Sequence, residues 1–157
     1  MNMEKKFELT DNFIINAFGV KLFQIKCTKS FKYAKEGDLG GYVEKDENLD
    51  QESDAWVSGN AEVSGDAWVS GDARVSGDAW VSGDARVSGD AWVSGYARVY
   101  GYARVYGYAE VAGNARVAGN AWVSGNARVY GYAEIDNNNK HCGFDCFGSA
   151  NRHTLPT

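Results

Sequence analysis

The chain repeats a six-residue pattern of apolar and polar positions without a gap from residue 53 to residue 135. Valine recurs at every sixth residue from Val57 to Val129, and Ile135 takes the next place. Alanine stands two residues before each of them, and glycine follows each valine by two. A period of six does not match the 3.6-residue period of an α-helix, and such regular glycine would weaken a helix. In each Ala-x-Val unit, Ala and Val point to one side and the middle residue to the other. The pattern therefore predicts very short strands, joined by turns at Gly-Asp and Gly-Asn.

Two irregular segments flank the repeat. Residues 1–50 are predicted to form an N-terminal β cap and an entry segment, because residues 7–27 are rich in aromatic and aliphatic side chains. Polar breaks at Thr10–Asn12 and at Gly19 divide this stretch into two or three short strands, and we expect a hairpin. Leu49 lies eight residues before Val57, which indicates an earlier coil and a short insertion.

The last segment, residues 136–157, is polar and irregular. We expect it to be a C-terminal tail that covers the other end of the repeat with its few apolar side chains, which are Phe144, Phe147 and Leu155. Covers of this kind are needed because an open solenoid end invites strand addition by another chain.

The repeat resembles the hexapeptide repeat of left-handed parallel β-helices. In that family three hexads make one triangular coil, with aliphatic and small residues filling the interior. The resemblance predicts an all-β protein whose residues 51–135 form a left-handed parallel β-helix, a triangular solenoid of about four to five coils.

The residue between Ala and Val is expected to face solvent, and this outward position holds all five tryptophans of the protein. Trp and Arg alternate there with a period of twelve at the start of the repeat. On an 18-residue coil, this alternation places Trp and Arg over one another on adjacent strands of one sheet, about 4.8 Å apart. We call each such strand of a sheet a rung. Arg74 should then lie between two indoles. Cation–π contacts of this kind are worth about 0.5–1 kcal/mol when exposed. The residues concerned are Trp56, Trp68, Trp80, Trp92, Arg74, Arg86 and Arg98.

Two interpretations of these faces stay open. The stacks either only hold the rod together, or they bind a partner, since exposed aromatic residues and arginine are the usual anchors of interfaces.

Tyrosine interrupts the repeat in one place. Three tyrosines replace aspartate at the three corners of a single coil, and two more lie beside them. A purely structural rod does not need this belt, so we expect a contact surface for a partner or for self-association. The five residues are Tyr96, Tyr100, Tyr102, Tyr106 and Tyr108.

Charge varies along the chain. The net charge is −5, which gives no general reason to expect nucleic-acid binding. A basic run from Lys21 to Lys35 could contact an acidic surface or simply protect a strand edge. Residues 54–92 carry six Asp, one Glu and two Arg, whereas residues 93–135 carry four Arg and two Glu. The stacked aspartates suggest either a weak Ca²⁺ site or solvated turns; the latter is our expectation.

Little in the sequence points to catalysis or to a cofactor. The best-known enzymes with this repeat are acyltransferases that use a histidine base, but the repeat contains no histidine. His141, Cys142, Cys146 and His153 could hold Zn²⁺, although their spacing is unusual. We therefore expect no enzyme activity, no cofactor and no metal. Three cysteines make no even-numbered disulfide set, and no apolar run spans a bilayer, so we expect a cytoplasmic protein.

The wider chain is similar to phage- and prophage-encoded hexapeptide-repeat proteins of uncharacterised role. The similarity lies in EGDLGGYVEK (36–45) and CFGSANR (146–152). It implies an accessory protein that binds and blocks a host macromolecule, such as a defence protein. The alternatives are a self-assembling structural protein, as a trimer or a stacked rod, and an acyltransferase-like enzyme.

Overall fold

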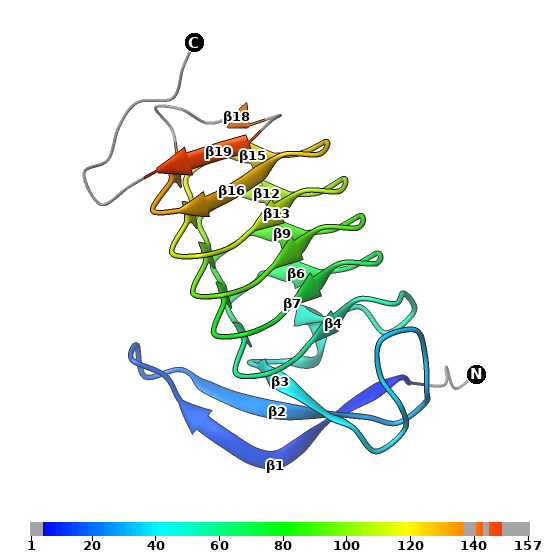
Figure 1. The fold of residues 1–157 in the computed structure, drawn as a ribbon. Helices are drawn as coiled ribbons and strands as arrows, with labels where there is room; N and C mark the ends of the chain where they lie inside the picture. The colour runs from blue at the N-terminus through cyan, green and yellow to red at the C-terminus, as the bar shows by residue number, and fades with distance from the viewer. Residues whose placement is uncertain (1–4, 137–140, 143–144, 149–157) are drawn as a thin grey trace.

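The computed structural model describes residues 5–136, 141–142 and 145–148, and the two last segments by their backbone alone. Within these residues there is no α-helix; one 3₁₀ turn, η1 (Asp46–Asn48), interrupts a series of strands. Figure 1 shows a rod of stacked turns standing on three longer strands. Those three are β1 (Phe7–Ile15), β2 (Lys21–Cys27) and β3 (Leu39–Val43).

Each hexad forms one short strand, centred on its outward residue and its valine. The strands are β4 (Trp56–Val57), β5 (Glu62–Val63), β6 (Trp68–Val69), β7 (Arg74–Val75), β8 (Trp80–Val81), β9 (Arg86–Val87), β10 (Trp92–Val93), β11 (Arg98–Val99), β12 (Arg104–Val105), β13 (Glu110–Val111), β14 (Arg116–Val117), β15 (Trp122–Val123), β16 (Arg128–Gly131) and β17 (Glu134–Ile135).

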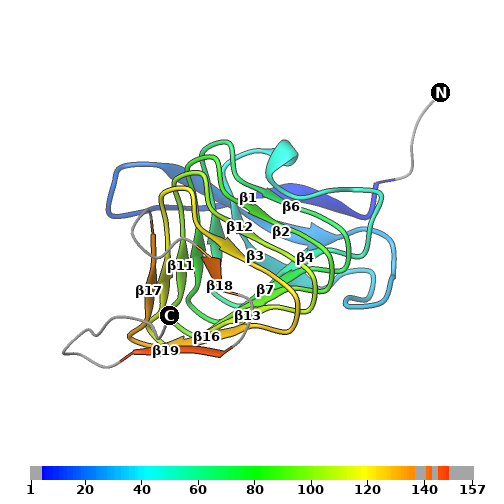
Figure 2. The ribbon, with the colours of Figure 1, turned by 90° about the horizontal axis from the view of Figure 1, so that it is seen from above.

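The strands pair in parallel with the strand three places further along the chain. Trp92, for example, pairs with Arg74 on one side and with Glu110 on the other, so its partners lie three hexads away in each direction. Three parallel sheets result, and the coils lie over one another when viewed along the rod (Figure 2). The predicted all-β solenoid with parallel sheets, about five coils long, is confirmed.

We call the three sheets faces 1, 2 and 3. Face 1 contains β4, β7, β10, β13, β16 and β19 (Asp145–Gly148). Face 2 contains β5, β8, β11, β14 and β17, and continues through β3 into β2 and β1. Face 3 contains β6, β9, β12, β15 and β18 (His141–Cys142). The tail is therefore not the wholly irregular segment that the sequence suggested, because it contributes the strands β18 and β19. The apolar residues Phe144 and Leu155, which were expected to cover the end of the repeat, lie outside the described residues.

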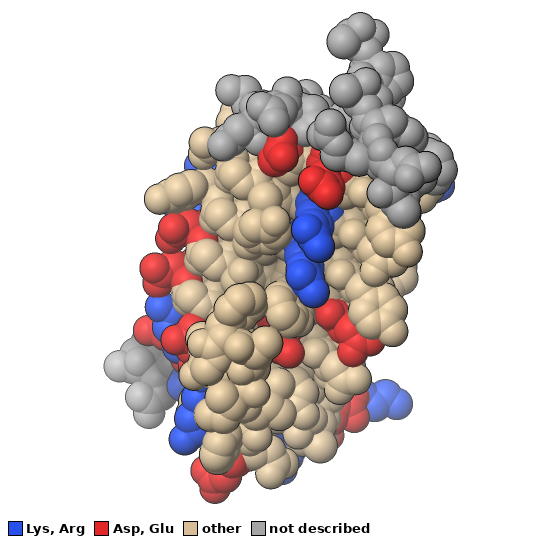
Figure 3. All heavy atoms as spheres, turned by 90° about the vertical axis from the view of Figure 1, so that its left-hand side faces the viewer, with Lys and Arg blue, Asp and Glu red and all other residues tan. Residues whose placement is uncertain are grey.

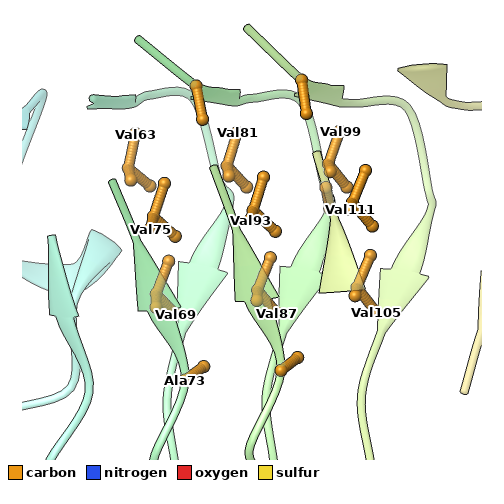
Figure 4. Close-up of a cluster of buried hydrophobic side chains, with 14 of the residues drawn as sticks. Val63, Val69, Ala73, Val75, Val81, Val87, Val93, Val99, Val105 and Val111 are labelled. Carbon is orange, nitrogen blue, oxygen red and sulfur yellow. The ribbon is translucent and has the colours of Figure 1, made fainter. Parts of the chain in front are cut away.

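The core consists of the repeated valines and alanines. Every valine from Val57 to Val129 is fully buried, as is Ile135. Figure 4 shows the valines of successive coils in columns, each column pointing inward from one sheet. Each buried valine contributes roughly 1.5–3 kcal/mol, and its partners lie in the coils above and below, so neighbouring coils stabilise each other.

Glycine is required at the corners for two reasons. Gly89 has φ +66°, in the left-handed region that favours glycine, and a Cβ there would lie 2.8 Å from the backbone nitrogen of Gly107 in the next coil. The neighbouring Asp90 N–H donates to the Gly107 carbonyl oxygen at 2.7 Å. The corners of adjacent coils therefore approach too closely for any side chain at this position.

The solenoid begins one coil before the regular repeat. Val43 pairs with Val63, and Leu49 forms a bridge to Val69, so each pairing spans slightly more than three hexads. Both Val43 and Leu49 are buried. The insertion expected between Leu49 and Val57 is thus confirmed, and it makes this coil longer than those that follow.

The N-terminal segment forms the expected hairpin. β1 and β2 are antiparallel, and their turn contains Gly19 with φ +80°. The predicted break at Thr10–Asn12 is wrong: β1 continues through it, because a register irregularity between Leu9 and Phe13 absorbs the polar residues.

Lys6 joins the hairpin to the insertion. Its ammonium donates to the carbonyl oxygens of Ser53 and Ala55, and the side-chain oxygen of Gln51 accepts from the Lys6 backbone N–H. Only 4% of Lys6 is exposed. Burial lowers the pKa of the Lys6 ammonium to about 8, although Asp50 opposes this shift.

Candidate binding surface

Tryptophan and arginine stack along the faces as the twelve-residue alternation predicted. The Arg98 Cζ lies 4.5 Å from the centroid of the Trp80 ring on face 2. On face 3, the Arg86 Cζ lies 5.9 Å from the ring of Trp68. On face 1, the Arg74 Cζ lies 4.5 Å from the centroid of the Trp92 ring. In all three contacts, the guanidinium group of an arginine lies over an indole ring on the adjacent rung.

Arg74 pairs with Trp56 on one adjacent strand and with Trp92 on the other, as predicted, but of these two indoles its guanidinium stacks on that of Trp92. Its second ring neighbour is Tyr33, at 5.0 Å, and not Trp56. Trp56 also does not face solvent as expected: it is 5% exposed, and Phe31 packs edge-on against it at 5.3 Å. The physical reason is that the loop between β2 and β3 folds over the first rung of face 1.

This loop and face 1 enclose a groove, which we call the junction groove, with a volume of about 420 Å³. Within it the Trp92 indole N–H donates to the Ser76 hydroxyl at 2.9 Å, which fixes the ring. The groove is lined by Tyr33, Asp38, Leu39, Trp56, Ser58, Arg74, Ser76 and Trp92. Aromatic walls with a few fixed polar groups are typical of ligand sites. The hexad pattern contains no signal that would place the loop residues here.

On face 2 the tip of the hairpin covers the lower rungs. Phe18 contacts the Trp80 ring edge-on at 5.6 Å. Burial raises the pKa of the Glu62 carboxyl one rung below, and a hydrogen bond from Asn16 partly opposes this. Arg98 and Arg116 pair on the rungs above. Figure 3 looks onto this side of the rod and shows a short column of basic side chains above the hairpin tip.

The five tyrosines predicted as a belt lie at the corners of one coil. Tyr96, Tyr102 and Tyr108 are the most exposed of them, at 64–66%. Their side chains make no hydrogen bond or ring contact with the residues that the structure describes. The other two, Tyr100 and Tyr106, are half-buried to exposed beside them. We call these five residues the tyrosine belt.

The belt surrounds the rod, because its three most exposed members lie at three different corners. Arg98 on face 2 lies between Tyr96 and Tyr102 in the chain, and Arg104 on face 3 lies between Tyr102 and Tyr108. One flat partner can therefore contact two of these corners and the arginine between them.

The sequence points to two further groups of residues, the possible metal ligands and the basic run. Within residues 5–136 no three His, Cys, Asp or Glu side chains gather as a metal ion would need. The possible zinc ligands, which are His141, Cys142, Cys146 and His153, have side chains outside the part of the chain that the structure describes. Of the basic run, Lys21 stacks on Phe13 at 4.1 Å and Lys32 lies over Tyr33 at 5.2 Å.

Comparison with known proteins agrees with the fold. Residues 67–83 and 79–95 match a family model described as YdcK Beta solenoid repeat. No curated protein matches the chain. The fold and these repeats define the chain as a β-solenoid repeat protein. The part of the chain that the structure describes holds no helix with the length and apolar character needed to cross a bilayer.

Proposed function

We propose that the protein is a non-enzymatic binding module of the cytoplasm, which presents the tyrosine belt and the Trp/Arg faces to a protein partner. The observation that carries the proposal is the exposure of Tyr96, Tyr102 and Tyr108 on a rigid coil whose neighbouring Trp and Arg side chains are stacked on one another. Exposed tyrosine and arginine are the residues that most often anchor interfaces.

The finer description of the fold is part of the proposal. The pairing of strands three hexads apart and the Val, Ala and Gly positions support a left-handed, triangular hexapeptide-repeat coil. The similarity of residues 36–45 and 146–152 to phage-encoded proteins supports an accessory protein that binds and blocks a host macromolecule, such as a defence protein.

The belt can be tested without disturbing the coil. Aspartate occupies the equivalent corners one coil earlier, at 78, 84 and 90. The triple variant Tyr96→Asp, Tyr102→Asp, Tyr108→Asp should therefore fold, and it should lose the proteins that the wild type retains from a bacterial lysate. Truncating an anchor at an interface costs about 2 kcal/mol or more, so retention should fall at least tenfold.

A matched control changes the lower coil instead. The variant Asp78→Asn, Asp84→Asn, Asp90→Asn alters the same three corners with a residue that the repeat uses elsewhere, and it should retain the partners. If the tyrosine variant also retains every partner, the belt is not the binding surface.

A second candidate function, self-association, is favoured by the outer strand β1. β1 is the last strand of the eight-stranded sheet, and Phe13, Ile15 and Phe18 are exposed by 49%, 59% and 75% at its end and at the hairpin tip. An outer strand with apolar side chains is a template for pairing with another copy.

Self-association predicts a molar mass that rises with concentration in light scattering. Ile15→Lys should abolish the rise, because a charge at a strand edge opposes pairing. A wild-type protein that stays monomeric across a wide concentration range would reject this function.

A further inference from the structure

Face 3 carries a second groove, of about 270 Å³, separate from the junction groove on face 1. It is lined by Arg86, Ser88, Arg104, Tyr106 and Trp122. Arg86 and Arg104 are direct partners in the parallel sheet, so their outward side chains start about 4.8 Å apart on adjacent rungs. Both arginines are exposed.

The charges near the two arginines differ from one coil to the next. Among the residues that the structure describes, neither arginine makes an ion pair. Corner aspartates, Asp84 and Asp90, flank Arg86 in the chain, whereas Tyr102 and Tyr108 occupy the same positions around Arg104. Tyrosine therefore stands at the two corners next to Arg104 in the chain, where the coil below carries aspartate next to Arg86.

The lining groups match a specific ligand chemistry. Paired guanidinium groups bind phosphate with forked hydrogen bonds, and the hydroxyls of Ser88 and Tyr106 are further donors. The Trp122 ring, 45% exposed, forms one wall, and the exposed part of an indole is a surface on which a base stacks. Adjacent like charges repel, and an anion bound between them reduces that repulsion.

From these groups we propose that the groove on face 3 binds a mononucleotide. Its phosphate lies on Arg86 and Arg104, and its base lies against Trp122. Because the groove is open and small, part of the ligand stays in solvent. The site goes beyond the proposed protein-binding function and does not rest on it.

The test is calorimetric titration of the full chain at low ionic strength with AMP, inorganic phosphate and adenosine. AMP should bind more tightly than phosphate or adenosine alone. Arg104→Gln should weaken AMP binding about tenfold or more, as expected for the loss of a hydrogen bond to a charged group. Arg116→Gln removes the same charge from face 2, where Glu134 lies on the next rung, and should change the affinity less than about twofold.

Three results would overturn the proposal: no saturable binding of AMP, phosphate binding as tight as AMP binding, or equal losses in the two arginine variants. Far-ultraviolet circular dichroism of each variant establishes that the solenoid is intact. Failure of this test leaves the tyrosine belt unaffected, because the lysate experiment measures a protein partner at the corners.

Discussion

Replacing Gly89 with alanine should lower the free energy of unfolding by about 2–5 kcal/mol. The left-handed backbone alone costs an L-residue roughly 1–2 kcal/mol. The added methyl group would also lie 2.8 Å from the nitrogen and 3.0 Å from the oxygen of Gly107, and forcing atoms into a packed position costs about 1–3 kcal/mol more. Urea denaturation of Gly89→Ala measures the loss directly.

Gly19 is the matched control. It also has a positive φ, +80°, but a Cβ there meets nothing within 4 Å. Gly19→Ala should therefore show the backbone cost without the clash, about 1–2 kcal/mol. Equal losses in the two variants would mean that close stacking of the corners does not contribute.

Trp56→Ala should have the largest effect of any change in the outward position of the repeat, about 3–5 kcal/mol. Although the hexad places Trp56 on the outside, it is 5% exposed and packs on Phe31. Removing the indole leaves a cavity between the β2–β3 loop and face 1, and Phe31 of the loop loses its edge-on contact. Urea denaturation of the variant gives the size of the loss.

Trp68 provides the comparison, because it occupies the same place in its hexad but is 41% exposed. Its contact with Arg86 is a surface stack, worth about 0.5–1 kcal/mol. Trp68→Ala should therefore lose no more than about 1 kcal/mol for that stack. Similar losses for the two tryptophans would contradict the burial of Trp56 beneath the loop.

The repeat could be predicted from the sequence because its contacts are periodic. Once a coil consists of three hexads, the neighbours of Arg86 and Arg98 on the adjacent coils are the residues 18 positions away in the chain. The inward direction of the valines follows from the same six-residue pattern. The same periodicity located the tyrosine belt, since Tyr96, Tyr102 and Tyr108 each replace an Asp at a known corner. The insertion before Val57 was visible as a change of spacing.

The junction groove could not be predicted in this way. It depends on where an irregular loop folds, and no period relates Tyr33 to Arg74. The signal available was the presence of Phe31 and Tyr33 within a lysine-rich stretch, because aromatic side chains in a polar loop need an apolar surface. The sequence did not show which surface, so Trp56 was predicted to be exposed.

The most direct test of the binding proposal is chemical modification of tyrosine in the free protein and in a complex recovered from a lysate. Tetranitromethane modifies accessible tyrosines, and mass spectrometry locates the modified residues. The proposal predicts that Tyr96, Tyr102 and Tyr108 react in the free protein, as their exposure of 64–66% requires, and that at least two of them are protected in the complex. Equal modification of all three in both samples would contradict it.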